Sequence, residues 1–456
     1  MLDGKNCWGK LIGDVRKERG IGMAFLNMFN LFAAVIFTAL IIVYGYQMIY
    51  VLISMIHRKV KPLPDTDQKN RFAIMISARN EEGVIFELLD SLNNMHYPRN
   101  LFDIYVIADN CTDETAEVSR KHGAIVVERF NNVKKGKGYA LHDLYHEIIS
   151  HKGHDYYDAY VVFDADNLVD PDFLMEVNKK WATGGYDALT TYRNSKNFST
   201  NWLSAAYSIW FMHEARHLNY VRDMIGAQCM ISGTGFVVSE HVMKNNNGWP
   251  FYFLTEDIQF SVDSTLQGYR IGYVDSAILY DEQPSTMKQS WNQRLRWAKG
   301  FYQIDLKYLG TLAKALFTVQ GIRRKIGVYD VMMTCLPCTL LTVGFAGMAL
   351  FVLAGSLYMP YYVRLLFQQD MISLLCNMLL GTWQTMVILA SLTVASEWDR
   401  IPAANRDKLK YIWIFPMYML TYIPITIQAL FTKVTWKPIQ HYSTSQLAAQ
   451  RKTLNY

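Results

Sequence analysis

Apolar and charged residues are segregated along the chain. Four stretches contain no Asp, Glu, Lys or Arg, namely Gly20–Ile56, Val331–Val363, Met371–Ser396 and Tyr411–Thr432. Each is at least as long as the ~20 apolar residues that cross a bilayer as a helix. We therefore expect four transmembrane helices. The first is too long for a cleaved signal peptide and lacks the small-residue cleavage site, so we expect it to persist as a signal anchor.

The polar region between the first and second of these stretches alternates short apolar runs with helical patterns at 82–92 and 112–122. The strand-like runs are Phe72–Ser77, Ile104–Asp109, Ala124–Arg129 and Ala159–Asp164. Strands that alternate with helices predict βαβ units and a mainly parallel sheet. Ligands bind such sheets beyond the carboxyl ends of the strands, so the residues after each run are the first site candidates.

Composition agrees with a membrane protein that carries a globular domain. Of the 456 residues 51% are hydrophobic and 19% are charged, with a formal net charge of +5, which excludes a disordered chain. None of the six cysteines suggests a paired disulfide framework, and this favours a reducing compartment for the polar region. Cys335 and Cys338 have CxxC spacing but lie inside an apolar stretch, where we expect them to serve packing.

The chain is therefore expected to have five parts. A basic run at His57–Lys61 marks a cytoplasmic exit of the first span, and basic and aromatic residues interleave at 285–326, which is typical of helices in a membrane interface. The parts are an N-terminal segment with the first transmembrane helix (1–61), a cytosolic α/β domain (71–284), amphipathic interface helices (285–326), three further transmembrane helices (327–432) and a short tail (433–456).

Acidic residues stand at the ends of the predicted strands. Asp109 ends one strand, and Asp164-Ala165-Asp166 ends another. Two carboxylates one residue apart can hold Mg²⁺ or Mn²⁺ together with a diphosphate, although a solvated turn would use the same residues. Lys137, in the segment Gly136-Lys137-Gly138, would place a cation beside phosphate oxygens. A plain basic loop is the alternative.

Two downstream motifs add candidates for catalysis. In Thr255-Glu256-Asp257 a carboxylate is either a helix cap or the base that deprotonates an acceptor hydroxyl. In the run 293–297, Gln293, Arg296 and Trp297 share one face of a helix at positions i, i+3 and i+4. That face offers an amide, a guanidinium and an indole. An amphipathic surface helix is the alternative.

In this order the motifs resemble those of the membrane-embedded processive family 2 glycosyltransferases, which include cellulose, hyaluronan, chitin and mixed-linkage glucan synthases. The resemblance covers roughly residues 72–300 and ends in a complete Q-R-x-R-W at 293–297. It implies a GT-A catalytic domain, that is, a Rossmann-like α/β fold with a mainly parallel sheet, on the cytosolic face. The implied donor is a UDP-sugar and the implied cofactor is Mg²⁺ or Mn²⁺.

The resemblance also implies a role for each matching residue. For the donor, it assigns the uridine to Ser77, Arg79, Glu81 and Asp109, the diphosphate to Lys137, and the metal to Asp164 and Asp166, with Asp166 the more direct ligand. For the acceptor, it assigns the neighbouring loop to residues 232–235, including Thr234, and the catalytic base to Asp257, with Glu256 as the alternative. Closure over the two sugars is assigned to Gln293, Arg296 and Trp297. Arg294 is a further candidate for contact with the diphosphate.

We therefore expect a processive inverting glycosyltransferase that polymerises sugar from a UDP-sugar and passes the product through the plasma membrane. UDP-glucose and a β-glucan are the first expectation. The alternatives are a UDP-N-acetylglucosamine-using synthase of the hyaluronan or poly-N-acetylglucosamine type, and a single transfer to a lipid acceptor. A channel or transporter is a third class, which the absence of charged residues in the spans disfavours. We expect no nucleic-acid partner.

Topology follows from the location of UDP-sugars in the cytosol. With the α/β domain inside and Met23–Ile56 as one span, the N-terminus lies outside, and three later spans place the C-terminus outside too. The basic residues of the tail, such as Lys433 and Lys437, fit this badly. Cellulose synthases often append a cyclic-di-GMP-binding domain after their last span. About 24 residues follow Thr432, too few for one, so we expect none here.

Overall fold

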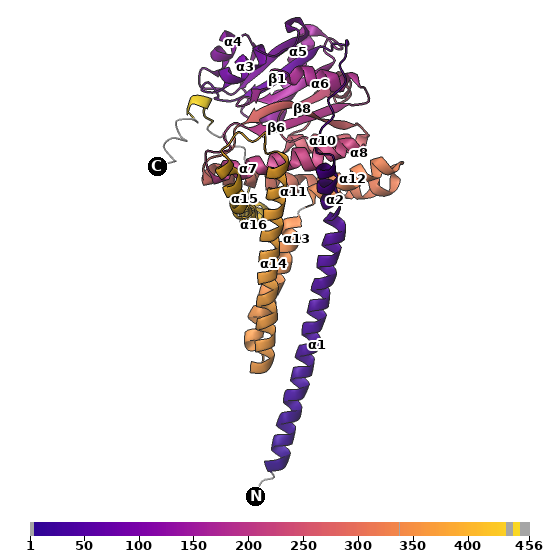
Figure 1. Ribbon diagram of the computed structural model, residues 1–456, viewed down its shortest axis with the longest axis vertical. Helices are drawn as coiled ribbons and strands as arrows, with labels where there is room; N and C mark the ends of the chain where they lie inside the picture. The colour runs from indigo at the N-terminus through magenta and orange to yellow at the C-terminus, as the bar shows by residue number, and fades with distance from the viewer. Residues whose placement is uncertain (1–3, 337, 435–440, 447–456) are drawn as a thin grey trace. The chain divides into compact units, whose positions relative to one another are not determined.

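The computed structural model describes residues 4–336, 338–434 and 441–446 (Figure 1). The chain forms two compact units. The smaller unit comprises residues 1–49 and 338–386, and the larger unit comprises residues 50–337 and 387–456.

The described part of the larger unit contains an eight-stranded sheet in the order β3-β2-β1-β4-β7-β6-β8-β5. The strands are β1 Phe72–Ala78, β2 Phe102–Asp109, β3 Ile125–Arg129, β4 Ala159–Asp164, β5 Leu168–Val169, β6 Ala188–Ser195, β7 Phe236–Ser239 and β8 Ile271–Asp281. The pairs β1–β2, β1–β4, β2–β3 and β6–β8 are parallel, whereas β7 is antiparallel to both β4 and β6, and β5 to β8. This is the mainly parallel sheet that the alternating pattern predicts.

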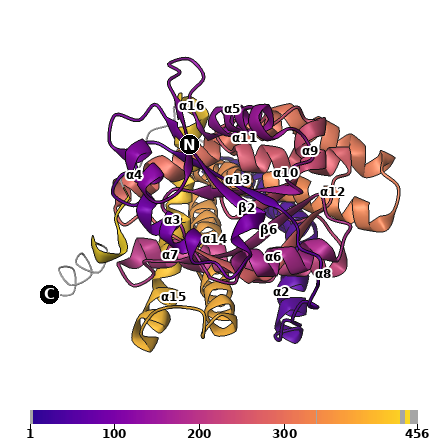
Figure 2. The ribbon, with the colours of Figure 1, turned by 90° about the horizontal axis from the view of Figure 1, so that it is seen from above.

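Helices cover the sheet (Figures 1 and 2). They are α3 Ile85–Asn93, α4 Thr115–Lys121, α5 Lys137–Lys152, α6 Phe173–Ala182, α7 Trp202–His213, α8 Tyr220–Ile225, α9 Glu240–Asn245 and α10 Glu256–Gln267, with short turns of helix at Arg99–Leu101 and Glu214–Asn219. The apolar faces of β1, β2 and β4 pack against α3 and α6 to form the main core, in which Phe72, Phe163 and Phe173 are fully buried. Burial of these runs on both faces explains why they read as continuous apolar strands.

The register brings the strand ends to one edge of the sheet. Ser77 of β1 pairs with Asp164 of β4, and Asp109 of β2 pairs with Arg129 of β3. Directly after β1 and β2 the chain turns through Asn80 (φ 58°) and Asn110 (φ 54°). Asn adopts this left-handed conformation more readily than most residues, so both strands stop abruptly and their following loops lie side by side.

Two long helices follow the sheet, α11 Met287–Thr318 and α12 Ile322–Cys335, and they pack on each other. They cover the expected interface region 285–326. The side chains of Leu306, Phe317 and Ile322 are exposed apolar groups, and Arg323 and Arg324 follow directly. Exposed apolar groups beside basic residues suit a membrane interface.

The smaller unit consists of long apolar helices, α1 Gly4–Tyr44, α13 Cys338–Gly355 and the first part of α14 Tyr361–Ser396; α2 Tyr46–Ile56 extends α1 into the larger unit. Phe29, Phe345 and Phe367 belong to its core. Within the described residues, four helical segments are long and apolar enough to cross a membrane: Gly22–Ile56, Thr339–Tyr358, Val363–Ser396 and Asn405–Phe431. These match the four stretches read from the sequence.

The fourth segment is placed differently from the expected final span. It is broken into α15 Asn405–Leu420, which contains Pro416, and α16 Tyr422–Phe431. Within the larger unit α15 packs on α7 and α16 packs on α11. Residues 441–446 lie at the carboxyl edge of the sheet, where His441 contacts Glu81. Residues 441–446 therefore contact the α/β domain, and the side of the tail, which the basic residues left in doubt, stays a prediction.

Candidate active site

The carboxyl edge of β1 and β2 forms one wall of the site. Asp109 is buried and accepts a hydrogen bond from Arg129 Nη1 at 2.6 Å, while Arg129 Nε donates to Asp143 at 2.6 Å. Ser77 and Arg79 lie at the end of β1 and just beyond it, and Glu81 follows in the adjoining turn. The structure thus brings together the four residues expected to contact uridine.

The two carboxylates of the D-x-D pair point to different neighbours. Asp164 Oδ1 lies 2.5 Å from Lys137 Nζ, which also donates to Gly233 O at 2.6 Å. The backbone N–H of Asp164 donates to Thr234 Oγ1 at 2.9 Å, so Thr234 also belongs to this group. Lys137 is the first residue of α5 rather than part of an open loop. Its placement fits a cation that meets a diphosphate.

Asp166 is 5% exposed and lies near His441, whose Nε2 is 3.8 Å from Asp166 Oδ2. Among the described residues its one hydrogen bond is long, from Asn167 Nδ2 at 3.5 Å. Burial raises the pKa of Asp166 to about 7, although the charge of His441 opposes this rise. A buried carboxylate with so little hydrogen bonding suits a cation ligand. No three His, Cys, Asp or Glu side chains converge in metal geometry in the described ranges, so a bound Mg²⁺ or Mn²⁺ would complete its shell with phosphate oxygens, as Mg²⁺ commonly does.

Glu256 and Asp257 begin α10 beside this pair. Burial, and secondarily the charge of Asp257, raises the pKa of Glu256 to about 7. Burial likewise raises the pKa of Asp257, opposed by the charges of Lys137 and Arg296. A Cβ placed on Gly233 (φ 78°) would lie 3.8 Å from Asp257 Oδ2, so the 232–235 loop runs alongside this carboxylate. The geometry groups the proposed base, the acceptor loop and Lys137 in one place.

The Q-R-x-R-W motif lies on α11, directly against the Thr-Glu-Asp triplet. A Cβ on Gly300 would come within 2.5 Å of Thr255 Oγ1, so glycine allows this close approach. Arg296 is near enough to lower the pKa of Glu256 and of Asp257. Gln293 Oε1 is buried without a hydrogen-bond partner in the part of the chain that the structure describes. Such an atom is free to meet a substrate hydroxyl.

Aromatic side chains surround Trp297. Its ring meets those of Tyr207 and Phe211 of α7 edge-on, with centroids 5.8 and 6.0 Å apart. The guanidinium of Arg193 stacks over Phe211 at 3.7 Å, is bonded to Asp281, and donates to Ser232 O at 3.0 Å. Sequence reasoning did not identify Arg193, Asp281, Tyr207 or Phe211, because isolated residues of these types carry no local motif.

Arg294 lies apart from this group. It is fully buried and donates to Tyr418 O at 3.1 Å and to Thr421 Oγ1 at 2.6 Å. Its guanidinium also lies over the rings of Tyr418 and Tyr422, at 4.4 and 5.0 Å. The structure therefore places Arg294 at the junction of α15 and α16, not with Lys137 where a diphosphate contact would require it.

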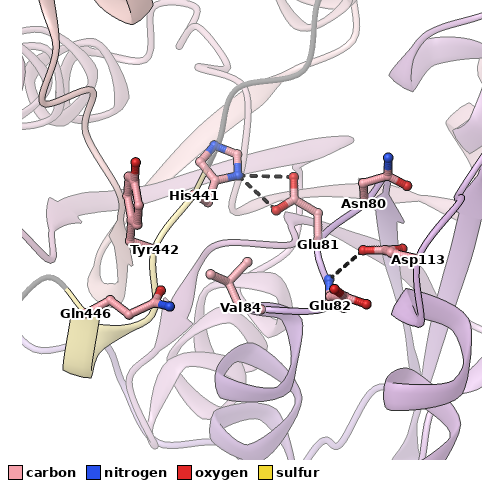
Figure 3. A pocket seen from close by; sticks show the side chains of 9 residues that line it. Asn80, Glu81, Glu82, Val84, Asp113, His441, Tyr442 and Gln446 are labelled. Carbon is pink, nitrogen blue, oxygen red and sulfur yellow. Dashed lines mark hydrogen bonds and ion pairs between the residues drawn. The ribbon is translucent and has the colours of Figure 1, made fainter.

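The C-terminal segment 441–446 adds residues that the sequence did not suggest. It borders a pocket of about 400 Å³ lined by Asn80, Glu81, Glu82, Gly83, Val84, Asp113, His441, Tyr442 and Gln446 (Figure 3). His441 Nδ1 lies 3.0 Å from Glu81 Oε2, and its Nε2 lies 3.8 Å from Asp166 Oδ2. Burial alone would lower the pKa of His441, but the carboxylates of Asp166 and Glu81 outweigh it and raise this pKa to about 10.

Part of the chain is similar in sequence to known glycosyltransferases. The probable glycosyltransferase YdaM of Bacillus subtilis is 28% identical over 57% of this chain and 60% of its own length. A β-monoglucosyldiacylglycerol synthase of Nostoc is 29% identical over 53% of this chain and 51% of its own length. A poly-β-1,6-N-acetyl-D-glucosamine synthase of Staphylococcus epidermidis is 27% identical over 53% of this chain and 57% of its own length. The chain thus spans between half and three-fifths of the length of these relatives.

Among solved structures, the mannosyltransferase PcManGT from Pyrobaculum calidifontis, in complex with GDP-Man and Mn²⁺, covers 80% of this chain and 99% of its own at a TM-score of 0.51 and 18% identity. This likeness shows the GT-A fold. Residues 69–300, more than half of the 456, match the family described as glycosyltransferase like family 2. With the fold, the strand-end carboxylates and this match together, the chain belongs to glycosyltransferase like family 2.

Proposed function

We propose that the chain is a membrane-bound inverting glycosyltransferase that takes its sugar from a UDP-sugar. The observation that carries this proposal is the convergence of Lys137, Asp164, Asp257 and Arg296 around the 232–235 loop. Cationic groups and a carboxylate there would serve the two halves of the reaction, departure of a diphosphate and deprotonation of an acceptor. A channel or transporter would need neither.

The donor would bind along the carboxyl edge of β1, β2 and β4. Uridine would lie near Asp109 and Glu81, and the diphosphate near Lys137. Asp166, with Asp164, would hold Mg²⁺ or Mn²⁺, which when bound supplies positive charge to the diphosphate oxygens. Lys137 adds a fixed positive charge on the same side, because Asp164 and Gly233 O hold its ammonium in place. Charge placed in advance where negative charge develops is commonly the largest catalytic contribution.

Asp257 would act as the base on the acceptor. It would take the proton of the acceptor hydroxyl as that oxygen bonds to the anomeric carbon from the face opposite UDP, so that the configuration inverts. Its raised pKa, caused mainly by burial, brings its proton affinity closer to that required of a base near neutral pH. The Trp297, Tyr207 and Phe211 rings would form an apolar wall for the acceptor sugar.

For the product we favour a polymer, a β-glucan made from UDP-glucose and passed through the plasma membrane, with the catalytic domain in the cytosol. The complete Q-R-x-R-W motif and its aromatic surroundings support repeated binding of a sugar chain. A single transfer to a lipid is the second candidate. It is supported by the β-monoglucosyldiacylglycerol synthases among the relatives and by the packing of α15 and α16 on the catalytic unit, which leaves fewer helices for a channel.

The test offers the purified protein UDP-glucose and UDP-N-acetylglucosamine separately, each with Mg²⁺ or Mn²⁺, with and without diacylglycerol. We expect UDP release with UDP-glucose and a large product that a β-glucan hydrolase degrades. A glucosylated lipid would establish the second candidate instead. No UDP release from any UDP-sugar under these conditions would reject the proposed activity.

A further inference from the structure

Lys196 carries an ammonium group that is buried and makes no hydrogen bond. Its side chain is 3% exposed, and its Nζ has no hydrogen-bond partner in the part of the chain that the structure describes. Among the same residues its one ion pair is with Glu87 Oε2, at 3.9 Å, which is beyond hydrogen-bonding distance. Buried charges are normally paired and hydrogen-bonded, because their removal from water is costly. An ammonium that leaves its N–H groups unused therefore points to a ligand.

The fold places Lys196 beside the carboxylates of the donor edge. Lys196 directly follows β6, and its backbone N–H donates to the carbonyl oxygen of Asp281, the last residue of β8, at 2.9 Å. The side chain of Asp281 accepts a hydrogen bond from Asn167 Nδ2 at 2.9 Å, and Asn167 directly follows Asp166. Burial raises the pKa of Asp166 and of Glu282, and the positive charge of Lys196 opposes both rises. The ammonium is thus near enough to act on the carboxylate that we propose as the cation ligand.

Lys196 and Lys137 differ in the hydrogen bonding that they have left to offer. Lys137 Nζ already meets Asp164 Oδ1 at 2.5 Å and Gly233 O at 2.6 Å, so two of its three N–H groups are engaged. Lys196 keeps all three for a ligand. Phosphate oxygens are strong acceptors for an ammonium, and the flexible four-carbon stem of a lysine lets the ammonium turn towards them. A phosphate group beside Asp166 is therefore the ligand chemistry that fits.

We propose that Lys196 is a second cationic ligand of the donor diphosphate, and that its ammonium turns from Glu87 to the phosphate oxygens when the nucleotide binds. The inference deepens the proposed function and rests on it, because it takes the Asp166 edge as the donor site. Lys137 from α5 and Lys196 from the end of β6 would then bind the diphosphate from two separate elements. Positive charge held in both places would stabilise the negative charge that develops on UDP as the sugar leaves.

The first measurement is the calorimetric affinity of the full-length protein for uridine and for UDP, both with Mg²⁺. Lys196→Met keeps the length of the side chain and removes its charge. We expect UDP affinity to fall roughly tenfold or more, the ordinary effect of losing a hydrogen bond to a charged group, while uridine affinity stays within about twofold. Lys196→Arg should retain more UDP affinity than Lys196→Met. The matched control is Lys244→Met, because Lys244 also pairs with a carboxylate, Asp155 at 2.9 Å, but lies near the opposite end of β4.

The second measurement is thermal unfolding with and without UDP and Mg²⁺. Because Lys196 makes no hydrogen bond in the absence of nucleotide, Lys196→Met should then unfold at about the same temperature as the unaltered protein. Saturation with UDP should raise the unfolding temperature of Lys196→Met less than that of the unaltered protein, since a ligand stabilises in proportion to the logarithm of its affinity.

The outcomes separate the role of Lys196 from the proposed function. If the unaltered protein binds neither uridine nor UDP, the donor site itself is rejected and the role of Lys196 with it. If the unaltered protein and Lys196→Met bind UDP equally well, the role of Lys196 is overturned and the donor site stands. Equal losses of uridine and UDP affinity in Lys196→Met, together with a lower unfolding temperature, would also overturn it, because Lys196 would then only balance the charge of the surrounding carboxylates.

Discussion

Glu256 and Asp257 are adjacent carboxylates with different expected roles at the start of α10. Asp257→Asn keeps the size and the hydrogen bonding of the side chain but removes its basicity. General-base catalysis contributes roughly 10²–10⁴-fold, so we expect turnover to fall by about that factor while UDP affinity stays within about twofold. The measurement is sugar transfer and UDP binding on the same preparation. If Asp257 were only a helix cap, Asn would serve about as well and activity would persist.

Glu256→Gln is the companion variant. Transfer that persists in Asp257→Asn but disappears in Glu256→Gln would assign the base to Glu256.

The raised pKa values of this pair predict opposite pH dependences for activity and stability. Glu256 has a pKa of about 7 in the folded protein against an ordinary value of 4.5, because burial disfavours its charged form. Its contribution to stability is therefore complete below about pH 4.5 and is lost as the pH rises towards 7. Activity should move the other way, since Asp257 must be deprotonated, and should fall as the pH drops through the raised pKa of Asp257.

Thermal unfolding and transfer rate measured from pH 4 to 9 test this pair of trends. Glu256→Gln should flatten the loss of stability between about pH 4.5 and 7. A variant whose stability profile matches that of the unaltered protein would show that Glu256 does not carry the effect.

At the scale of residues, candidate side chains can be read from the sequence where a motif is local. Asp164-x-Asp166 and the 255–257 triplet are read from a few neighbouring letters, and the fold brings them to one edge. His441 could not be found this way, because its partners Glu81 and Asp166 are 360 and 275 positions away and no spacing rule links them. Arg294 shows the reverse problem, since its motif is local but its contacts are with α15 and α16.

At the scale of elements, the strands β1 to β4 were predicted because each is a short apolar run that ends in polar residues, and β1, β2 and β4 are also buried. The remaining strands were not. β6 has the sequence ALTTYRNS, whose polar residues are buried through contacts with β8 and with Arg400. Helix α5 begins at Lys137, inside a segment whose glycines suggested a loop. Such elements depend on tertiary contacts that outweigh local preference.

The junction of α11 with α15 and α16 gives an element-scale prediction. Arg294→Lys removes the stacking on Tyr418 and Tyr422 and at least one hydrogen bond from a buried site. We expect a loss of roughly 1–3 kcal/mol in unfolding free energy, with UDP affinity nearly unchanged. Arg296→Lys should leave the unfolding free energy nearly unchanged and should weaken UDP binding, since Arg296 acts electrostatically on Glu256 and Asp257.

Thermal unfolding and UDP binding, measured for both variants in parallel, test these roles of Arg294 and Arg296. If Arg294→Lys weakened UDP binding more than Arg296→Lys, Arg294 would be a diphosphate ligand, as the resemblance to the processive enzymes implies.

At the scale of the whole molecule, the division into apolar spans and an α/β domain could be read from the sequence, because charge-free stretches of this length are typical of membrane helices and rare in globular domains. The path of the fourth charge-free stretch could not be read from the sequence. Composition makes 405–431 a candidate span, but Pro416 and the break at Thr421 let the chain fold back, with Tyr411, Phe415 and Tyr418 buried and Trp413 and Phe431 exposed. One apolar face of α15 and α16 covers the catalytic unit, and their other apolar face suits a membrane interface.

This arrangement predicts the sides on which labels should react. Because α15 and α16 pack on the catalytic unit and the segment 441–446 contacts Glu81 and Glu87, the thiol of Ser445→Cys should lie on the same side as that of Ser150→Cys in the catalytic domain. In intact cells neither should react with an impermeant maleimide, and both should react after permeabilisation. Tyr358 is 94% exposed and ends one candidate span, so the thiol of Tyr358→Cys should react from outside without permeabilisation. Labelling of Ser445→Cys from outside would show that 405–431 crosses the membrane, and labelling of Ser150→Cys would contradict a cytosolic catalytic domain.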